Sequence, residues 1–225
     1  QLSLLQIADN TPLHEYDNEI IHILRKKAQE SEISIETGAK RLDEDTLARY
    51  LDIAAFFNSK ILRFVIDDKT TNYYPPVDTI VSILKNSLPE LQTRSITLAI
   101  ENHDRFRAIE FEGIIEKTAS PYVGICLDCA NSLGAGEGIF ETVRVLAPYT
   151  VNLHLKDIHI SRKKHMMGFD IEGIPFGKGV IPLPWILSQM PSACKTAILE
   201  LWMPPAETKE KTCAKEQNWV KESLK

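Results

Sequence analysis

Four side chains of the types that bind divalent metals stand at or near the ends of apolar runs. They are Glu101, Asp128, His154 and Glu200. Two glutamates, an aspartate and a neutral imidazole form a mixed oxygen and nitrogen ligand set, which suits Mn²⁺, Mg²⁺, Co²⁺ or Zn²⁺ better than a metal that prefers thiolates. One carboxylate at the end of a strand is often a solvated turn residue, but four ligand types at successive runs are hard to explain by chance. The sequence therefore predicts one divalent metal site.

The runs that carry these residues belong to a repeating pattern. Seven short runs rich in β-branched and apolar residues recur along the chain: Leu4–Ala8, Ile33–Thr37, Ile61–Ile66, Ile96–Glu101, Val123–Asp128, Val151–Lys156 and Ala197–Leu201. Helical patterns separate several of them, over Asn18–Glu30, Asp45–Asn58, Val77–Leu91 and Gly138–Leu146. Strands that alternate with helices predict βαβ units and a parallel sheet, and the carboxyl ends of such strands lie on one face.

The number of strands favours a barrel that lacks one unit. A β/α barrel has eight strands, and the chain begins at Gln1, without a methionine, close to its first apolar run. We therefore predict a (β/α)8 TIM barrel whose first βα unit is missing from the sequence, with residues 1–225 as a single domain. An open doubly wound sheet would carry a glycine-rich phosphate loop after its first strand, whereas this segment reads Asp9-Asn10-Thr11-Pro12.

Composition excludes several other classes of protein. The net charge of −5 argues against a nucleic-acid binder, which usually presents a basic surface. The sequence contains no apolar run of the roughly 18–20 residues that a membrane helix needs. Four cysteines do not form a disulfide scaffold, and Cys126 and Cys129 fall on a predicted strand, where core thiols are expected. We expect a cytoplasmic protein with reduced cysteines.

Several segments resemble a known family. They are IENHDRF (100–106), SPYVGICLDCANSLGA (120–135), NLHLKD (152–157), MGFDIEGIPFGKG (167–179) and AILELW (197–202). Together they resemble the xylose-isomerase-like TIM-barrel superfamily, in its sugar phosphate isomerase/epimerase branch with the AP-endonuclease-2 type of domain. The resemblance spans nearly the whole chain. It implies one divalent ion held by Glu101, Asp128, His154 and Glu200, and an acid/base role for the two glutamates, as in the related ketose 3-epimerases.

Such a site can move protons next to a ketone. A divalent ion polarises the carbonyl and acidifies the adjacent C–H, so that a carboxylate can remove the proton and leave an ene-diolate. A second carboxylate on the opposite face inverts the carbon, and protonation of the neighbouring carbon isomerises the sugar. We therefore expect a metal-dependent isomerase or epimerase of carbohydrate metabolism that acts on a sugar, a sugar phosphate or a keto sugar, with Glu101 and Glu200 as the catalytic pair.

Further polar and aromatic residues are candidates for binding the substrate. They are His103, Asn131, Lys156, His165 and Trp202. Side chains alternate along a barrel strand, so Asn152, His154 and Lys156 are predicted to face the barrel axis. The stretch 161–180 is expected to be a long loop, and its basic residues make it a candidate lid. Glu36 and Arg63 are expected to form a buried ion pair.

Other functions stay open on the sequence alone. A lyase of the same superfamily, such as a keto-inositol-type dehydratase or a sugar-acid decarboxylase, would use Lys156 and the basic stretch to bind a substrate carboxylate. An AP endonuclease is less favoured, because those enzymes carry extra histidines where this chain has Asn131 and an isolated His165. A sugar-binding protein without catalysis leaves both glutamates unexplained. The expected partner is a small sugar, with no nucleic acid and no membrane, and self-association is left open.

Overall fold

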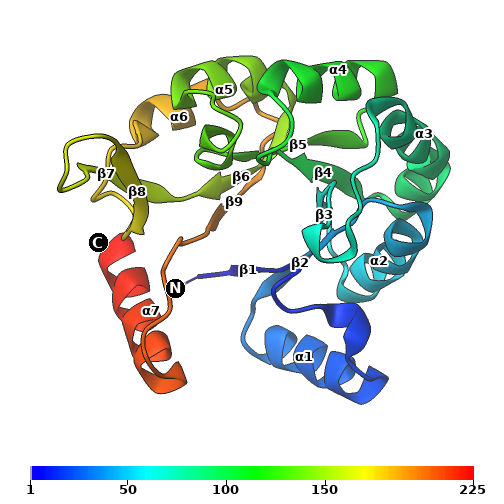
Figure 1. Ribbon diagram of the computed structural model, residues 1–225. Helices are drawn as coiled ribbons and strands as arrows, with labels where there is room; N and C mark the ends of the chain where they lie inside the picture. Colours follow the sequence, from blue (N-terminus) through cyan, green and yellow to red (C-terminus); the bar gives the residue numbers. More distant parts are fainter. Residues whose placement is uncertain (1) are drawn as a thin grey trace.

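The main sheet has seven parallel strands that curve around a common axis (Figure 1). A computed structural model describes residues 2–225. The strands are β1 (Leu4–Ile7), β2 (Ser34–Lys40), β3 (Ile61–Val65), β4 (Thr97–Glu101), β5 (Val123–Asp128), β6 (Thr150–Leu155) and β9 (Thr196–Leu199), paired in that order. All seven coincide with the apolar runs of the sequence to within a few residues, because each run buries side chains on the core face of the sheet.

Helices cover the outside of this sheet (Figure 1). They are α1 (Asn18–Glu30), α2 (Glu44–Phe57), α3 (Val77–Arg94), α4 (Ala108–Thr118), α5 (Ile139–Leu146) and α6 (Leu183–Gln189). The last helix, α7 (Lys209–Ser223), instead lies beside the opening of the sheet and buries none of its residues (Figure 1). Asp17 and Asp43 begin the first two, each accepting a hydrogen bond from a backbone N–H of the first turn. Within residues 2–225, no helix combines the length and the apolar character needed to cross a bilayer.

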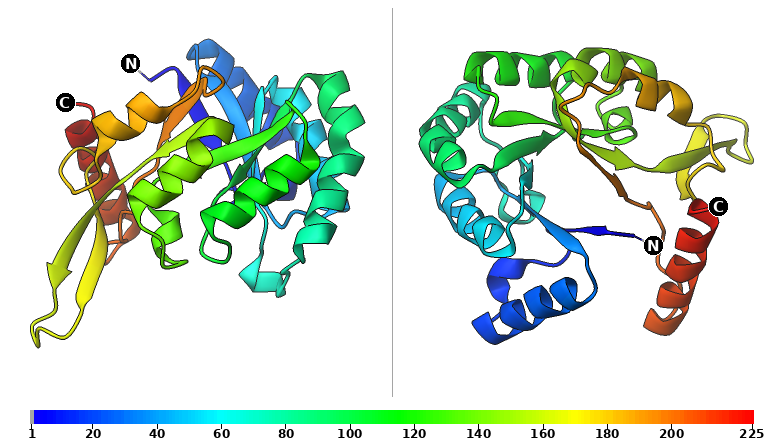
Figure 2. Two further views of the ribbon diagram at one scale, coloured as in Figure 1. Left: turned by 90° about the horizontal axis from the view of Figure 1, so that it is seen from above. Right: turned by 180° about the vertical axis from the view of Figure 1, so that it is seen from behind.

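The sheet is open at one place. Strands β1 and β9 form its two edges, and both ribbon views show a break between them (Figures 1 and 2). A β/α barrel contains eight strands, so the sheet is one strand short, and the predicted barrel with one βα unit missing is confirmed. Leu2 and Leu5, close to the β1 edge, are about half exposed.

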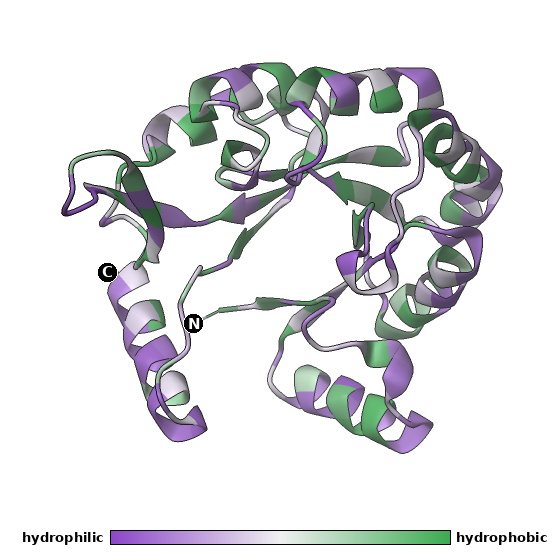
Figure 3. Cartoon of the chain, in the orientation of Figure 1, coloured by the Kyte–Doolittle hydropathy of each residue, from purple (hydrophilic) through white to green (hydrophobic). Residues whose placement is uncertain are grey.

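The apolar core lies between the sheet and the helices, and the polar residues lie inside the barrel. The inner faces of the helices are hydrophobic and their outer faces hydrophilic (Figure 3). Leu62 and Phe64 of β3 and Leu84 of α3 are fully buried in this layer. The barrel interior instead buries charged and amide side chains, which are Glu36, Arg63, Glu101, Asp128, Asn152, His154 and Lys156. The predicted alternation along β6 is thus confirmed.

The stretch expected to be a long loop is largely a β-hairpin. Strands β7 (Asp157–Arg162) and β8 (Phe169–Ile174) pair antiparallel and project away from the barrel (Figure 2). Facing pairs such as Ile160 with Ile171 provide the alternating β-branched pattern that favours a hairpin. Asp157 anchors its base by accepting backbone hydrogen bonds from Gly179, at 2.7 Å, and Ile181, at 3.1 Å. The expectation of a long irregular loop was therefore wrong.

Asp68 organises the loop that follows β3. Its carboxylate accepts hydrogen bonds from the hydroxyls of Thr70 (2.6 Å) and Thr71 (2.8 Å), and the ammonium of Lys40 lies 3.1 Å away. The side chain is almost fully buried. Burial acts to raise the pKa of Asp68, but these hydrogen bonds lower it well below its usual value. The loop therefore depends on the charged form of this residue.

We expect Asp68→Asn to lower the free energy of unfolding at pH 7 by about 1.5–3 kcal/mol, the usual contribution of hydrogen bonds to a charged group. Because the folded-state pKa is depressed, the contribution is present above the unfolded-state pKa of about 3.9 and is lost as the pH falls below it. Urea denaturation between pH 7 and pH 2.5 measures this difference. Asp52→Asn, at an exposed ion pair with Arg94, is the control. An equal effect of Asp68→Asn at both pH values would contradict the assignment.

Candidate metal centre

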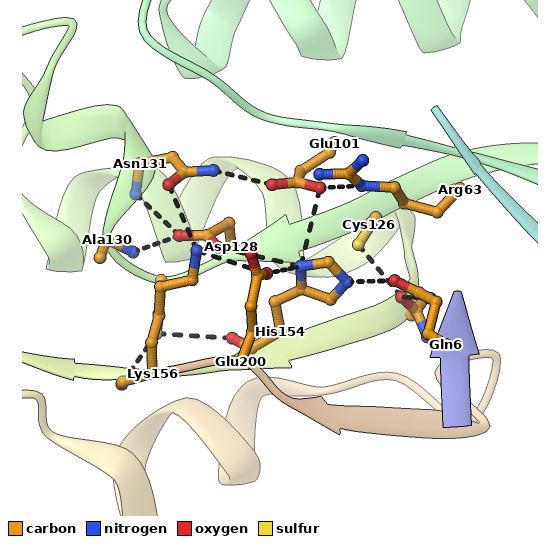
Figure 4. A network of polar contacts seen from close by, with 12 residues as sticks. Gln6, Arg63, Glu101, Cys126, Asp128, Ala130, Asn131, His154, Lys156 and Glu200 are labelled. Atoms are coloured by element: carbon orange, nitrogen blue, oxygen red, sulfur yellow. Dashed lines mark hydrogen bonds and ion pairs between the residues drawn. The ribbon is translucent and has the colours of Figure 1, made fainter. Parts of the chain in front are cut away.

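The four predicted metal ligands converge at the carboxyl ends of neighbouring strands (Figure 4). Glu101 ends β4, Asp128 ends β5, His154 lies on β6, and Glu200 directly follows β9. One ligand atom of each lies within 4.8 Å of the others. The strand registers produce this convergence, because Asp128 is opposite His154 across β5 and β6.

The ligand atoms of this cluster fit a bound cation. Nδ1 of His154 lies 2.5 Å from Oε2 of Glu200, 3.6 Å from Oε2 of Glu101 and 4.0 Å from Oδ2 of Asp128. Within the described part of the chain, His154 Nδ1, Asp128 Oδ2 and Glu200 Oε2 are buried and make no contact with the geometry of a hydrogen bond, although they lie close to one another and to the ammonium of Lys156. Buried polar atoms nearly always have a partner. A divalent ion would satisfy all three, so these four residues can hold one.

A buried lysine partly neutralises the cluster. The Nζ atom of Lys156 lies 2.6 Å from Oδ2 of Asp128 and 3.3 Å from Oε2 of Glu200. Burial acts to lower the pKa of Lys156, but these two carboxylates raise it above its ordinary value. Burial acts to raise the pKa of Glu200, but the close approach of the His154 imidazole and the charge of Lys156 lower it strongly. The pKa of Asp128 is raised by burial.

The carboxylate of Glu101 is held by two other side chains. Nε of Arg63 donates to its Oε2, and Nδ2 of Asn131 donates to its Oε1 at 2.8 Å. Arg63 also pairs with Asp9. The expected ion pair between Glu36 and Arg63 was therefore wrong: Arg63 lies opposite Ala99 in the β3–β4 register, so its long side chain reaches the carboxylate two residues further along β4.

Glu36 takes part in an amide network that the sequence did not predict. It accepts hydrogen bonds from Nε2 of Gln6, at 3.0 Å, and from Nδ2 of Asn152, at 3.2 Å. Oε1 of Gln6 lies 2.8 Å from Nε2 of His154. The only sequence signal for Gln6 is that it is a polar residue within the apolar run Leu4–Ala8. Cys126 and Cys129 are free, buried thiols, as expected.

Four of the five candidate substrate-binding residues line one cavity of about 1140 Å³ beside the cluster. They are His103, Asn131, Lys156 and Trp202. The ring of Trp202 lies 5.1 Å from Nζ of Lys156, and Nδ1 of His103 lies 3.1 Å from Asp104. His165 is elsewhere, exposed at the tip of the hairpin, where its Nδ1 accepts from the backbone N–H of Met167 at 3.2 Å.

Comparison with known proteins identifies the family. The model of the xylose isomerase-like TIM barrel matches residues 28–223. The chain belongs to this family. The fold and this family match both confirm the resemblance that the sequence motifs indicated. Proteins similar to this chain include enzymes that act on sugars and related compounds.

Individual relatives differ in activity. The chain is 28% identical over 223 residues to a 3-oxo-isoapionate decarboxylase of Pectobacterium atrosepticum. This alignment covers 98% of this chain and 80% of the decarboxylase. A xylose isomerase-like protein of Mycobacterium smegmatis, solved in complex with magnesium, aligns with a TM-score of 0.73 and 13% identity, covering 98% of this chain and 83% of that one. D-psicose 3-epimerase of Clostridium cellulolyticum, solved with D-tagatose, aligns with a TM-score of 0.70 and 16% identity, over 98% and 85%. The two structures share the fold.

We expect the protein to bind one divalent ion per chain, and His154→Ala to weaken binding by more than about 10–100-fold, the usual effect of removing a residue that only supports a ligand. Titration calorimetry with Mn²⁺ and Zn²⁺, together with elemental analysis of protein purified without chelator, measures both. His159→Ala, at an exposed position on β7, is the matched control. Unchanged affinity in His154→Ala would argue against this centre.

Proposed function

We propose that the protein is a divalent-metal-dependent lyase that removes CO₂ from a 3-oxo sugar acid. The observation that carries this proposal is the unequal environment of the two glutamates. The carboxylate of Glu101 is fully buried and paired with Arg63, whereas that of Glu200 is about 39% exposed and lies beside the ammonium of Lys156. An epimerase needs two carboxylates that exchange protons with the substrate from opposite faces. The ion pair between Glu101 and Arg63 does not favour such proton exchange at Glu101.

Decarboxylation of a 3-oxo acid requires only a group that polarises the ketone and a cation that binds the carboxylate, and the residues that line the cavity can provide both. A bound divalent ion would polarise the ketone and stabilise the negative charge that develops on its oxygen. Lys156 presents a buried cation to the cavity, next to the candidate metal ligands Asp128 and Glu200, and it can attract the carboxylate of a sugar acid. Trp202, next to that ammonium, provides an apolar wall that limits its solvation. The 28% identity with a 3-oxo acid decarboxylase over nearly the whole chain supports the same reaction.

The steps balance without a further reactant. The C–C bond between the carboxylate and the α carbon of the 3-oxo acid breaks, CO₂ leaves, and the electron pair passes into the carbonyl as an enolate. The α carbon then takes up one proton. Lys156 can donate this proton, because its raised pKa keeps it protonated at neutral pH, and water restores it. Glu200 keeps the ammonium directed into the cavity.

We expect Lys156→Met to slow CO₂ release from a 3-oxo sugar acid by about 10²–10⁴-fold, the usual range for losing a general acid. Release of ¹³CO₂ from carboxyl-labelled substrate, followed by NMR, measures the rate. Lys178→Met, at an exposed position, is the matched control and should behave as wild type. Wild-type protein that binds metal but releases no CO₂ from a panel of 3-oxo sugar acids would refute the decarboxylase assignment.

A metal-dependent isomerase or epimerase is the second candidate. It is favoured by the presence of both Glu101 and Glu200 among the four clustered side chains, since one carboxylate could remove a proton beside the ketone and the other return it. In this case Arg63 would have to release the carboxylate of Glu101 during the reaction. A small sugar is the substrate class in both proposals.

Isotope exchange separates the two candidates. If the protein is an epimerase, it should incorporate deuterium from D₂O at the carbon beside the carbonyl of a ketose, and Glu101→Gln and Glu200→Gln should each slow this by about 10²–10⁴-fold. NMR of a ketose library in D₂O measures the exchange. If the protein is a decarboxylase only, no ketose in the library exchanges, and deuterium appears only in the product of CO₂ loss.

A further inference from the structure

A continuous set of side-chain hydrogen bonds lies inside the barrel beside the ligand cluster, and Figure 4 shows Gln6 and Cys126 next to the imidazole of His154. It joins the thiol of Cys126 to the amide of Asn152 (3.1 Å), that amide to Gln6 (3.3 Å), and Gln6 to the imidazole of His154 (2.8 Å). The donor and the acceptor of each hydrogen bond can be assigned, because some of the neighbouring groups can only donate or only accept. The direction of the last bond then determines which ring nitrogen of His154 carries a proton.

The direction begins at Glu36, because a carboxylate oxygen accepts hydrogen bonds and does not donate them. Oε2 of Glu36 lies 3.2 Å from the Asn152 amide, so the nitrogen Nδ2 of that amide faces Glu36, and it also lies 2.7 Å from the hydroxyl of Thr196, which can accept. The oxygen Oδ1 of Asn152 then faces the thiol of Cys126, which can donate to it. Every contact of the Asn152 amide is satisfied in this orientation.

Two acceptors determine which way the side-chain amide of Gln6 is turned. Its Nε2 lies 3.3 Å from Oδ1 of Asn152 and 3.0 Å from Oε2 of Glu36, so both amide protons are used. The carbonyl oxygen of Gln6 consequently faces Nε2 of His154. A carbonyl oxygen accepts and cannot donate, so Nε2 of His154 must carry a hydrogen.

We propose that Gln6 is a positioning residue that reserves Nδ1 of His154 for the metal. A histidine that binds a metal must have one ring nitrogen free of hydrogen, and the hydrogen bond made by the other nitrogen decides which one it is. Nδ1 is the nitrogen that faces the carboxylates of Glu101, Asp128 and Glu200. This inference rests on the metal site of the proposed function, and it extends that site to an amide on the edge strand β1.

The spectroscopic test uses the full chain with Zn²⁺, which is diamagnetic. Protein labelled with ¹⁵N-histidine and loaded with Zn²⁺ is measured by long-range ¹H–¹⁵N correlation, and His154→Ala identifies the His154 signals among those of the six histidines. We expect a protonated Nε2 and a metal-bound Nδ1 in the wild type. Gln6→Met, which keeps the approximate volume and removes the acceptor, should speed exchange of the Nε2 proton with water and weaken Zn²⁺ binding by about 10–100-fold.

Two further variants make the test specific. The double variant Gln6→Glu/Glu36→Gln exchanges the two side chains that face each other in the β1–β2 register, restores an acceptor opposite Nε2, and should recover the wild-type spectrum and most of the affinity. Gln29→Met, at an exposed position on α1, should change neither. If Gln6→Met does not fold, Gln6→Ala, which also removes the acceptor opposite Nε2 of His154, is measured in its place.

The outcomes distinguish this inference from the function on which it rests. A wild type that binds Zn²⁺ through Nε2, with the proton on Nδ1, overturns the role of Gln6 and leaves the metal centre intact. A Gln6→Met protein with wild-type exchange and wild-type affinity also overturns it. Failure of the wild type to bind Zn²⁺ overturns the metal centre itself, and this inference with it. A wild-type spectrum as expected, together with recovery in the double variant, supports it.

Discussion

Two buried carboxylates and one half-buried carboxylate beside one imidazole are the constraint around which the interior of this barrel is arranged. Carboxylates removed from water repel one another and lose hydration, so they need cations or hydrogen-bond donors nearby. Arg63 and Asn131 satisfy Glu101, and Lys156 lies against Asp128 and Glu200. Asp128 Oδ2, His154 Nδ1 and Glu200 Oε2 still lack a hydrogen bond within the described residues and lie close together, where a divalent ion would complete the balance of charge.

Parallel strands make this concentration of charge possible. Successive side chains alternate, so each strand directs one set of residues to the apolar layer under the helices and the other into the barrel. In and directly after β6 the second set is Asn152, His154 and Lys156, all buried. This segment thus presents, in order along the axis, a network amide, a candidate metal ligand and a cation. Because of the same alternation, the apolar residues of one short strand pack under the helices while its polar residues lie inside the barrel.

The sequence predicted where the strands and the candidate ligands lie along the chain. It predicted much less about which side chains on different strands would contact each other. Apolar runs predicted the seven strands, and their ends predicted four ligands that the structure does bring together. The partner of Arg63 could not be predicted, because it depends on the β3–β4 register and on the reach of a long side chain. Gln6 gave almost no signal, since its role exists only when β1 lies close to β6. The hairpin was missed because its alternation is interrupted by a long basic turn.

Register also explains how the polar interior spans the break in the sheet. Gln6 lies opposite Glu36, Cys126 opposite Asn152, and Asn152 opposite Thr196. The bonds between these pairs follow neighbouring strands, but the bonds from Gln6 to Asn152 and His154 cross from β1 to β6, and the bond from Asn152 to Glu36 crosses from β6 to β2. The backbone ladder ends at β1 and at β9, whereas the side chains continue across that gap. The orientation of His154, the proposed metal-binding histidine, is thus tied to an edge strand of the sheet. Any change that displaces β1 should therefore act on the cluster through Gln6 before it disturbs the strands that carry the ligands themselves.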